Sequence, residues 1–128
     1  MTPGVTPLVA GNWKMNGSTA MTDALLIGLK EGLVQSVPDL DVVVCPPFLY
    51  IPLAVQTLAG STITVGAQNL DIHGPGAYTG EIAAEMLKEQ HCGYVIVGHS
   101  ERRALYGESS DLVAEKARVA VAAELKPI

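Results

Sequence analysis

Two apolar runs of this sequence end in polar side chains of the kinds that take part in chemistry. The letters GHSERR follow the run YVIV at once, and GNWK follows the run LVA. These stretches supply an amide, Asn12, an ammonium group, Lys14, and a group that can give or take a proton, His99. Such a set suits the stabilisation of an enolate or oxyanion that develops on a small anionic substrate.

Each of these side chains also has an interpretation without chemistry. Lys14 could be a solvated surface lysine, and His99 could be a core histidine whose hydrogen bonds are satisfied. If a helical turn begins at Ser100, its N-terminus would direct positive charge at the ring and keep the histidine neutral. Glu101 could pair with Lys14 or with either of the arginines that follow it, and a structural ion pair is the role that we expect.

The polar residues need a scaffold, and the sequence predicts one. Four apolar runs without clean alternation predict strands that are buried on both faces, as in a parallel sheet. The runs cover residues 8–13, 41–45, 63–67 and 94–98, and helical patterns cover 18–35, 51–59, 81–90 and 109–125. This alternation predicts an α/β fold with right-handed crossovers, and residues 126–128 would begin a fifth strand. Ligands bind at the carboxyl ends of such strands, where the polar residues lie.

The first and the last of these helices have the clearest sequence signals. In the first, a serine or threonine at 18 or 19 would cap the N-terminus. The residues that we expect on its buried face are Met21, Leu25, Leu29 and Leu33. The last helix begins with a serine cap and an acidic first turn, and it is the most strongly predicted of the four.

Composition excludes several classes of function. The 128 residues, 48% of them hydrophobic, suffice for one domain, residues 1–128, with a core of its own. A net charge of −5 argues against a nucleic-acid partner, and no apolar run is long enough for a membrane span. The N-terminus lacks the pattern of a secretory signal, so we expect a cytoplasmic protein with Cys45 and Cys92 as reduced core thiols. A disulfide or a metal site is the alternative for these cysteines.

The loop at 68–80, after the third predicted strand, is unusually long. Loops between a strand and a helix usually have roughly 2–6 residues, and longer ones are often functional. Its glycines, in GPGAYTG, match a dinucleotide fingerprint poorly, because their spacing differs and a proline interrupts them. We therefore expect no nucleotide site in this loop.

Taken together, these stretches resemble the triosephosphate isomerase family. The motifs GNWKMNG, CPPFLYI, VGAQNL, GAYTGEIAAEML, YVIVGHSERR and GESSDLVAEKARVA occur in this order, from about Leu8 to Ile128. The resemblance implies a parallel (β/α)8 TIM barrel, of which this chain holds the first four βα units and the start of strand five. It also implies interconversion of dihydroxyacetone phosphate and D-glyceraldehyde 3-phosphate through an enediolate, in glycolysis and gluconeogenesis, without a metal or an organic cofactor.

The resemblance assigns roles to single residues. Asn12 would help to hold the substrate, and Lys14 would stabilise the charge of the phosphate and the enediolate. His99, in its neutral form, would polarise the carbonyl and carry a proton between the substrate oxygens. Glu101 and Arg102 match positions that support these three residues without touching the substrate.

The resemblance further implies a homodimer in the full-length form. The loop at 68–80 matches the family's dimerisation loop, and Thr79 would reach into the partner's pocket to brace the asparagine and the histidine there. Gln68 and Met15 match further positions of the dimer interface.

The chain departs from the family in what it lacks. The family's general base is a glutamate after the sixth strand, and loops after strands seven and eight grip the phosphate; none of the 128 residues corresponds to them. Loss of a general base alone removes roughly 10²–10⁴-fold of rate. We therefore expect the isolated chain to be inactive, as one piece of a barrel or as a half that needs a complementary C-terminal half. Glu81 and Glu101 are the carboxylates that we consider as substitute bases.

Other interpretations remain at this stage. The chain could be a catalytically inactive assembly unit that keeps Asn12, Lys14 and His99 by descent. It could also be an unrelated doubly wound binding domain. As a half barrel folded alone, it would leave both edges of its sheet open and would expose the face that fills a closed barrel.

Overall fold

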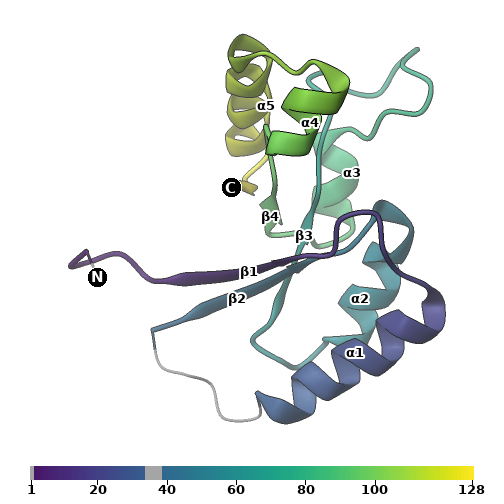
Figure 1. Ribbon diagram of the computed structural model, residues 1–128, viewed down its shortest axis with the longest axis vertical. Coiled ribbons are helices and arrows are strands. Elements are labelled where there is room, and N and C mark those ends of the chain that lie inside the picture. The colour runs from purple at the N-terminus through teal and green to yellow at the C-terminus, as the bar shows by residue number, and fades with distance from the viewer. Residues whose placement is uncertain (1, 34–38) are drawn as a thin grey trace.

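In the described sheet each strand after the first pairs with the strand that precedes it in the chain, so the order is β1-β2-β3-β4-β5 and all pairs are parallel. The computed structural model describes residues 2–33 and 39–128 (Figure 1). The strands are β1 Leu8–Asn12, β2 Asp41–Cys45, β3 Thr64–Ala67, β4 Tyr94–Val95 and β5 Lys126–Pro127. The helices are α1 Thr19–Gly32, the 3-10 helix η1 Phe48–Tyr50, α2 Ile51–Thr57, α3 Ala84–Glu89, α4 Ser100–Tyr106 and α5 Ser110–Ala122.

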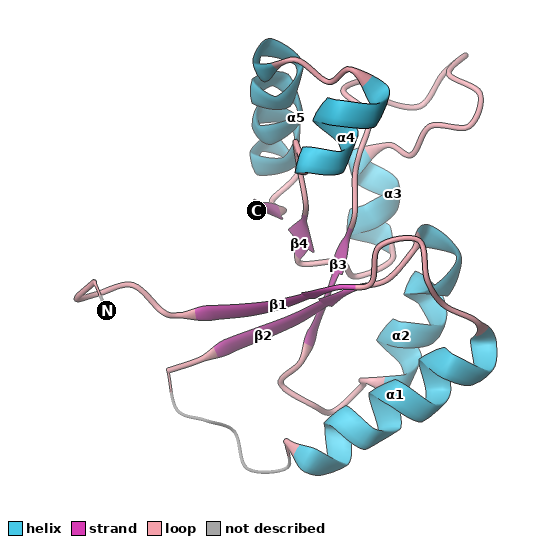
Figure 2. Ribbon diagram, in the orientation of Figure 1, coloured by secondary structure: helices cyan, strands magenta, loops and turns pink. Residues whose placement is uncertain are grey.

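The sheet is strongly twisted, and the helices follow it along one side. In Figure 2 the strands β1 and β2 run nearly horizontally, whereas β3 and β4 run nearly vertically. The helices α1 and α2 lie against the first part of the sheet, and α4 and α5 lie beyond the carboxyl end of β4 and beside β5. This arrangement confirms the predicted half of a parallel barrel. Among the described residues, no helix is long and apolar enough to cross a membrane.

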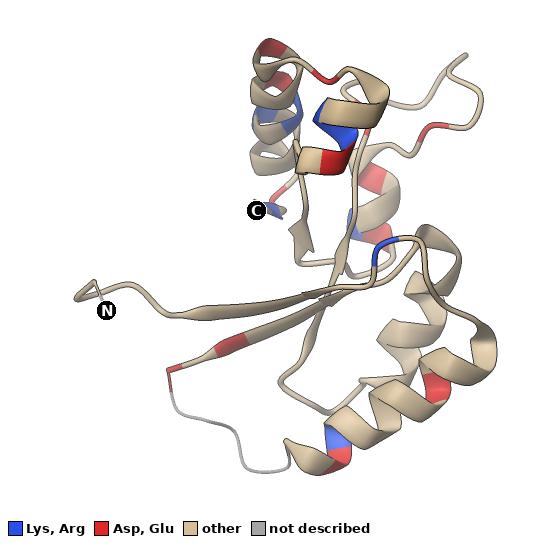
Figure 3. Ribbon diagram, in the orientation of Figure 1, with Lys and Arg blue, Asp and Glu red and all other residues tan. Residues whose placement is uncertain are grey.

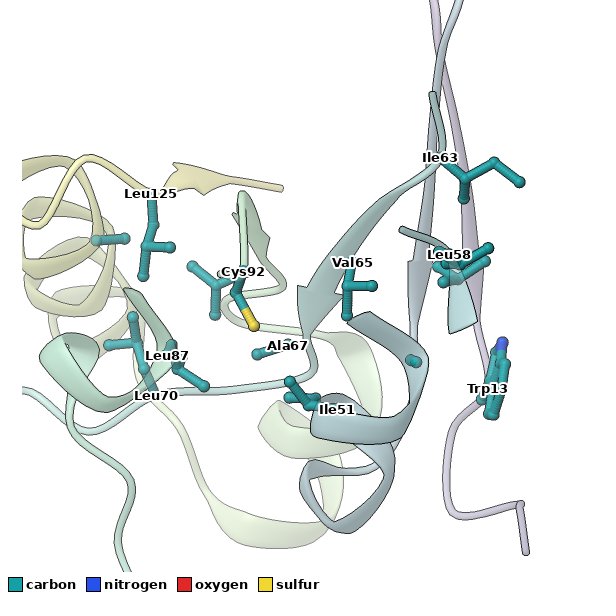
Figure 4. Packing of buried hydrophobic residues seen from close by; sticks show 14 of the residues in the cluster. Trp13, Ile51, Leu58, Ile63, Val65, Ala67, Leu70, Leu87, Cys92 and Leu125 are labelled. Carbon is teal, nitrogen blue, oxygen red and sulfur yellow. The ribbon is translucent and has the colours of Figure 1, made fainter. Parts of the chain in front are cut away.

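The core lies between the sheet and the helices. Its buried residues come from the outward face of β2, β3 and β4 and from α1, α2, α3 and α5. In Figure 4 the side chains of Val65 and Ala67 from β3 lie among Ile51, Leu58 and Leu87. A second, smaller cluster covers the opposite face of the sheet and consists of Val43, Cys45, Tyr94 and Ile96.

Gly66 in β3 makes room for this second cluster. A Cβ at this position would lie 2.8 Å from Sγ of Cys45 and 3.1 Å from the Tyr94 carbonyl oxygen. The strand backbone therefore approaches its two neighbours more closely than any larger residue would allow. The phenol of Tyr94 donates to Oδ2 of Asp41, the first residue of β2, at 3.1 Å.

The prediction that every strand is buried on both faces is wrong for β1. The central strands are buried as expected, but β1 is exposed along nearly its whole length, and Val9 keeps 55% of its surface accessible. The reason is its place at the edge of the described sheet, because β2 is its one neighbour there. An apolar run shows that a strand suits burial, but its neighbours decide whether burial occurs.

The predicted buried row of α1 is displaced by one residue at its start. Met21 and Leu25 are exposed, and the buried positions are Thr22 and Leu26. Thr22 tolerates burial because its hydroxyl donates to the Ser18 carbonyl at 2.7 Å. Leu29 and Leu33 do pack against the core, as predicted. Ser18 caps the helix by accepting from the Met21 N–H, whereas the predicted residues 34 and 35 lie outside the described residues.

Candidate active site

The loop after β1 holds Lys14 in a backbone conformation that is uncommon for a residue with a side chain. Its φ angle is +55°, in the left-handed region. Such a conformation costs about 1–3 kcal/mol and persists where the surroundings enforce it. Here the Lys14 N–H donates to Oδ1 of Asn12 at 2.9 Å, and the Lys14 carbonyl accepts Nε2 of Gln68 at 2.8 Å. Two of the predicted site residues therefore fix the backbone of a third.

The turn between β4 and α4 positions His99. Gly98 adopts a φ of +63°, and His99 then forms the N-cap of α4. Its ring nitrogen Nδ1 accepts the backbone N–H of Glu101 at 3.1 Å. Because a backbone N–H only donates, this nitrogen carries no proton, and the proton of the neutral ring lies on Nε2. The helical turn that the sequence suggested at Ser100 is in fact a helix of two turns.

Lys14 and Glu101 connect the two stretches. Nζ of Lys14 lies 2.7 Å from Oε1 of Glu101, so of the partners that the sequence allowed, the lysine is the one that Glu101 takes. The hydrogen bond from this ammonium lowers the pKa of the Glu101 carboxyl and outweighs the opposing effect of desolvation. The distance from Oε2 of Glu101 to Nδ1 of His99 is 3.6 Å, which is too long for a hydrogen bond.

An open pocket of about 410 Å³ lies between these loops. It is called the site pocket below. Of the predicted site residues it is lined by Asn12, Lys14, Met15, Gln68, His99, Glu101 and Arg102. The fold thus brings together residues that lie up to 90 positions apart in the chain, at the carboxyl ends of β1, β3 and β4. Figure 3 shows that charged residues gather on α4 and α5, whereas β1 and α2 carry none.

Two predicted residues lie elsewhere. Thr79 is exposed in the loop after β3 and does not line the site pocket of its own chain. Glu81, considered above as a substitute base, borders a small separate cavity beside Asp71 and His73. In that loop the ring of His73 stacks on Tyr78 with centroids 3.9 Å apart, and its Nδ1 lies 2.8 Å from Oδ2 of Asp71.

A buried charged cluster behind the site pocket was not predicted. Oε2 of Glu108 accepts both Nε of Arg102, at 2.7 Å, and Nζ of Lys116, at 2.6 Å. Lys116 also donates to Oδ1 of Asn69 at 2.8 Å. Desolvation raises the pKa of the Glu108 carboxyl, but the hydrogen bonds from Lys116 and Arg102 outweigh it and lower the pKa.

The sequence did contain a signal for this cluster. Lys116 stands four residues after Leu112 and four before Ala120, on the apolar row of the last predicted helix. A charge on a buried row requires a partner of opposite charge. Glu108 lies just before that helix, eight residues before Lys116, and was one of the candidates.

The described residues offer no cluster of three or more histidine, cysteine, aspartate or glutamate side chains that could hold a metal ion. Cys45 and Cys92 are free and buried. Burial raises the pKa of the Cys45 thiol to about 12 and that of Cys92 to about 11. Both thiols therefore form the thiolate poorly, and the thiolate is the form that binds a metal.

Known proteins share this sequence and this fold. A family model described as "Triosephosphate isomerase" matches residues 7–128. A triosephosphate isomerase from Nitrosococcus oceani is 55% identical over 123 residues, which cover 96% of this chain and 49% of that protein. One from Thiobacillus denitrificans is 54% identical over 121 residues, 94% of this chain and 47% of the relative.

A solved structure agrees with the sequence comparison. The crystal structure of triosephosphate isomerase from Bartonella henselae superposes with a TM-score of 0.88 at 37% identity, over 96% of this chain and 50% of that one. The chain thus spans about half the length of the relatives that it matches. With the parallel half barrel and the family model in agreement, the chain belongs to the triosephosphate isomerase family.

Proposed function

We propose that this chain, as one half-barrel domain of residues 1–128, supplies the carbonyl-polarising half of a site that interconverts dihydroxyacetone phosphate and D-glyceraldehyde 3-phosphate. The observation that carries the proposal is the convergence of Asn12, Lys14 and His99 on one pocket at the carboxyl ends of the strands. The reaction would place the protein in glycolysis and gluconeogenesis.

His99 would donate from Nε2 to the substrate carbonyl oxygen. Its Nδ1 is already committed to the Glu101 N–H, so the ring offers a neutral donor at the other nitrogen. A donor of this kind stabilises negative charge as it develops on the oxygen of an enediolate. The same nitrogen can then carry a proton between the two neighbouring oxygens of the substrate.

Lys14 would supply the fixed positive charge. Its ammonium lies at the pocket wall with more than half of the side chain accessible, while Glu101 holds it at 2.7 Å. Asn12 uses its Oδ1 to accept the Lys14 N–H, which leaves its amide N–H groups for a substrate oxygen. In a protein with a net charge of −5, a local cation of this kind is needed to attract a phosphate ester.

The complete reaction also needs a general base and a firm grip on the phosphate. We propose that a complementary C-terminal half, equivalent to the part of the relatives that this chain does not cover, provides both. The exposed edge strand β1 and the end of β5 are the places where such a half would continue the sheet.

The experiment combines this chain with the C-terminal half of the Nitrosococcus oceani relative and measures conversion of glyceraldehyde 3-phosphate in a coupled assay. Turnover should require both halves, and His99→Gln should lower it by roughly 10²–10⁴-fold. Lys14→Met should also lower it, whereas Lys88→Met, at another exposed ion-paired lysine, should not. Turnover that survives His99→Gln would refute the proposed role of the histidine.

We further propose that the assembled protein is a homodimer. Apolar side chains surround the site pocket and remain exposed: Met15 at 94%, Leu105 at 72% and Tyr106 at 67%. Exposed apolar patches of this kind mark protein interfaces. The loop at 68–80 is long, and its residues 73–80, which include Thr79, are exposed, so this loop of a second copy is the occupant that we propose for the pocket rim.

Light scattering on the assembled protein tests the dimer. The unchanged protein should have twice the mass of one protomer, and Thr79→Arg should halve this mass because the arginine does not fit the partner's pocket. Thr62→Arg, at an exposed threonine outside the loop, is the matched control and should leave the mass unchanged. A mass that stays doubled with Thr79→Arg would exclude this contact.

The proposed compartment is the cytoplasm. Free thiols persist in reducing compartments, and both cysteines of this chain are free and buried. Fractionation of the source cells would check this assignment, and recovery in an oxidising compartment would contradict it.

A further inference from the structure

The side chain of Gln68 bridges two strand ends. Its Nε2 donates to the Lys14 carbonyl at 2.8 Å and to the Cys45 carbonyl at 2.9 Å. The first carbonyl belongs to the loop after β1, and the second ends β2. The Cys45 carbonyl also accepts the Trp13 N–H at 3.1 Å, so one small hydrogen-bonded network joins the two loops.

Both N–H groups of this amide are thus used within its own chain. An amide side chain has two donors and one acceptor oxygen. In any contact with a second subunit, Gln68 would therefore have its oxygen alone to offer. An interface role does not account for the two donated hydrogen bonds.

The first of these hydrogen bonds goes to Lys14, whose backbone is strained. Lys14 has a φ angle of +55°, and strained backbone persists where several contacts enforce it. Asn12 holds the Lys14 N–H and Gln68 holds its carbonyl, so both ends of this residue are fixed. With the backbone fixed, Nζ reaches Glu101 at 2.7 Å.

Gln68 is itself held from the other side. The next residue, Asn69, accepts Nζ of Lys116, whose other partner is the buried carboxylate of Glu108. The loop after β3 is therefore anchored to α5 by a buried lysine, and the anchored loop presents Gln68 to the strand ends.

We infer that Gln68 is a positioning residue for Lys14: its amide holds the strained backbone so that the ammonium lies at the site pocket beside Glu101. The inference rests on the proposed function, because that function gives Lys14 its role in the site. The contact between Gln68 and Lys14 can itself be tested without a substrate.

The test is the titration of the Glu101 carboxyl in the 128-residue chain, followed by carbon-13 NMR. Gln68→Met keeps the length of the side chain and removes both donors. It should raise the pKa of Glu101 toward the value found with Lys14→Met, because the ammonium then leaves the carboxylate. In the Lys14→Met background, Gln68→Met should have no further effect. Gln56→Met, the same change at an exposed glutamine of α2, is the matched control.

An unchanged Glu101 pKa in Gln68→Met would overturn the inference. A second measurement needs no variant, and it decides the question if Gln68→Met does not fold. In the unchanged chain the side-chain amide protons of Gln68 should exchange with solvent at least 10-fold more slowly than those of Gln56; equal rates would overturn the inference. Neither measurement involves triose phosphate, so failure of the proposed function would leave both results intact.

Discussion

The ammonium of Lys116 lies 2.6 Å from Oε2 of Glu108, and both side chains are buried. The same oxygen accepts Nε of Arg102, so two cations share one carboxylate oxygen. The other oxygen, Oε1, has no hydrogen-bond partner among the described residues. Because Arg102 belongs to α4 and Lys116 to α5, this carboxylate links the two helices behind the site pocket.

Removal of the carboxylate should destabilise the chain strongly. Glu108→Leu would leave the buried Lys116 ammonium without its counter-charge, and loss of one partner of a buried ion pair costs about 3–5 kcal/mol. Urea unfolding followed by circular dichroism measures the change. Glu115→Gln removes an exposed pair with Arg118 and should cost less than about 1 kcal/mol. Equal costs for the two variants would show that the Glu108 pair contributes no more than a surface pair.

Stability should fall in acid because of the same carboxylate. The pKa of Glu108 is lowered on folding from an ordinary value of 4.5, so the unfolded chain binds the proton more tightly. Its contribution is therefore fully present above about pH 4.5 and is lost as the pH falls through the lowered value. Unfolding curves between pH 6 and pH 3 should show a flatter acid decline for Glu108→Gln. Some acid decline in stability should remain in that variant, because the pKa values of Asp71 and Glu101 are also lowered.

Gly98 should tolerate no side chain. A Cβ there would lie 2.6 Å from Cγ1 of Val113, and the residue has a φ of +63°. Gly98→Ala should therefore cost about 1–2 kcal/mol for the conformation and about 1–3 kcal/mol more for the clash. Gly107 has a φ of +70°, but a Cβ added there would meet nothing within 4 Å. Gly107→Ala should therefore show the cost of the conformation without the cost of a clash.

Val113→Ala offers a direct check on the source of the second cost. It removes the methyl groups that the new Cβ would meet, so it should recover part of the stability lost in Gly98→Ala. Thermal unfolding of the single and double variants gives this coupling. Strict additivity of the two changes would show that the destabilisation has another source.

The two thiols should resist modification in the folded chain. Burial raises the pKa of Cys45 to about 12 and that of Cys92 to about 11, and the thiolate is the reactive form. With Ellman's reagent at pH 8, we expect neither thiol to react in buffer and both to react in denaturant. Rapid reaction of a thiol in buffer would mean that one face of the sheet opens readily.

The order of the elements was predictable from sequence because apolar runs and helical periods are local properties. Burial was predicted less well, since Val9 suits a core but lies on an edge strand, and Met21 suits a buried face that Thr22 occupies instead. The site pocket was predicted from the rule that the carboxyl ends of parallel strands meet. Its support was missed: Lys116 on an apolar row was a local signal for a partner such as Glu108. The contact of Lys116 with Asn69, 47 residues away in the chain, depends on tertiary packing that no short segment encodes.

The agreement between strand order and chain order has a consequence for how this protein folds during its synthesis on the ribosome. Each strand after β1 pairs with the one before it, roughly 30 residues earlier, which is the length of one βαβ unit. Translation releases about 5–20 residues per second, so each unit emerges over seconds, whereas hairpins and helices form in microseconds. A newly exposed strand therefore finds its partner already outside the exit tunnel. The sheet can grow in the direction of translation, and no strand needs to wait for a later one.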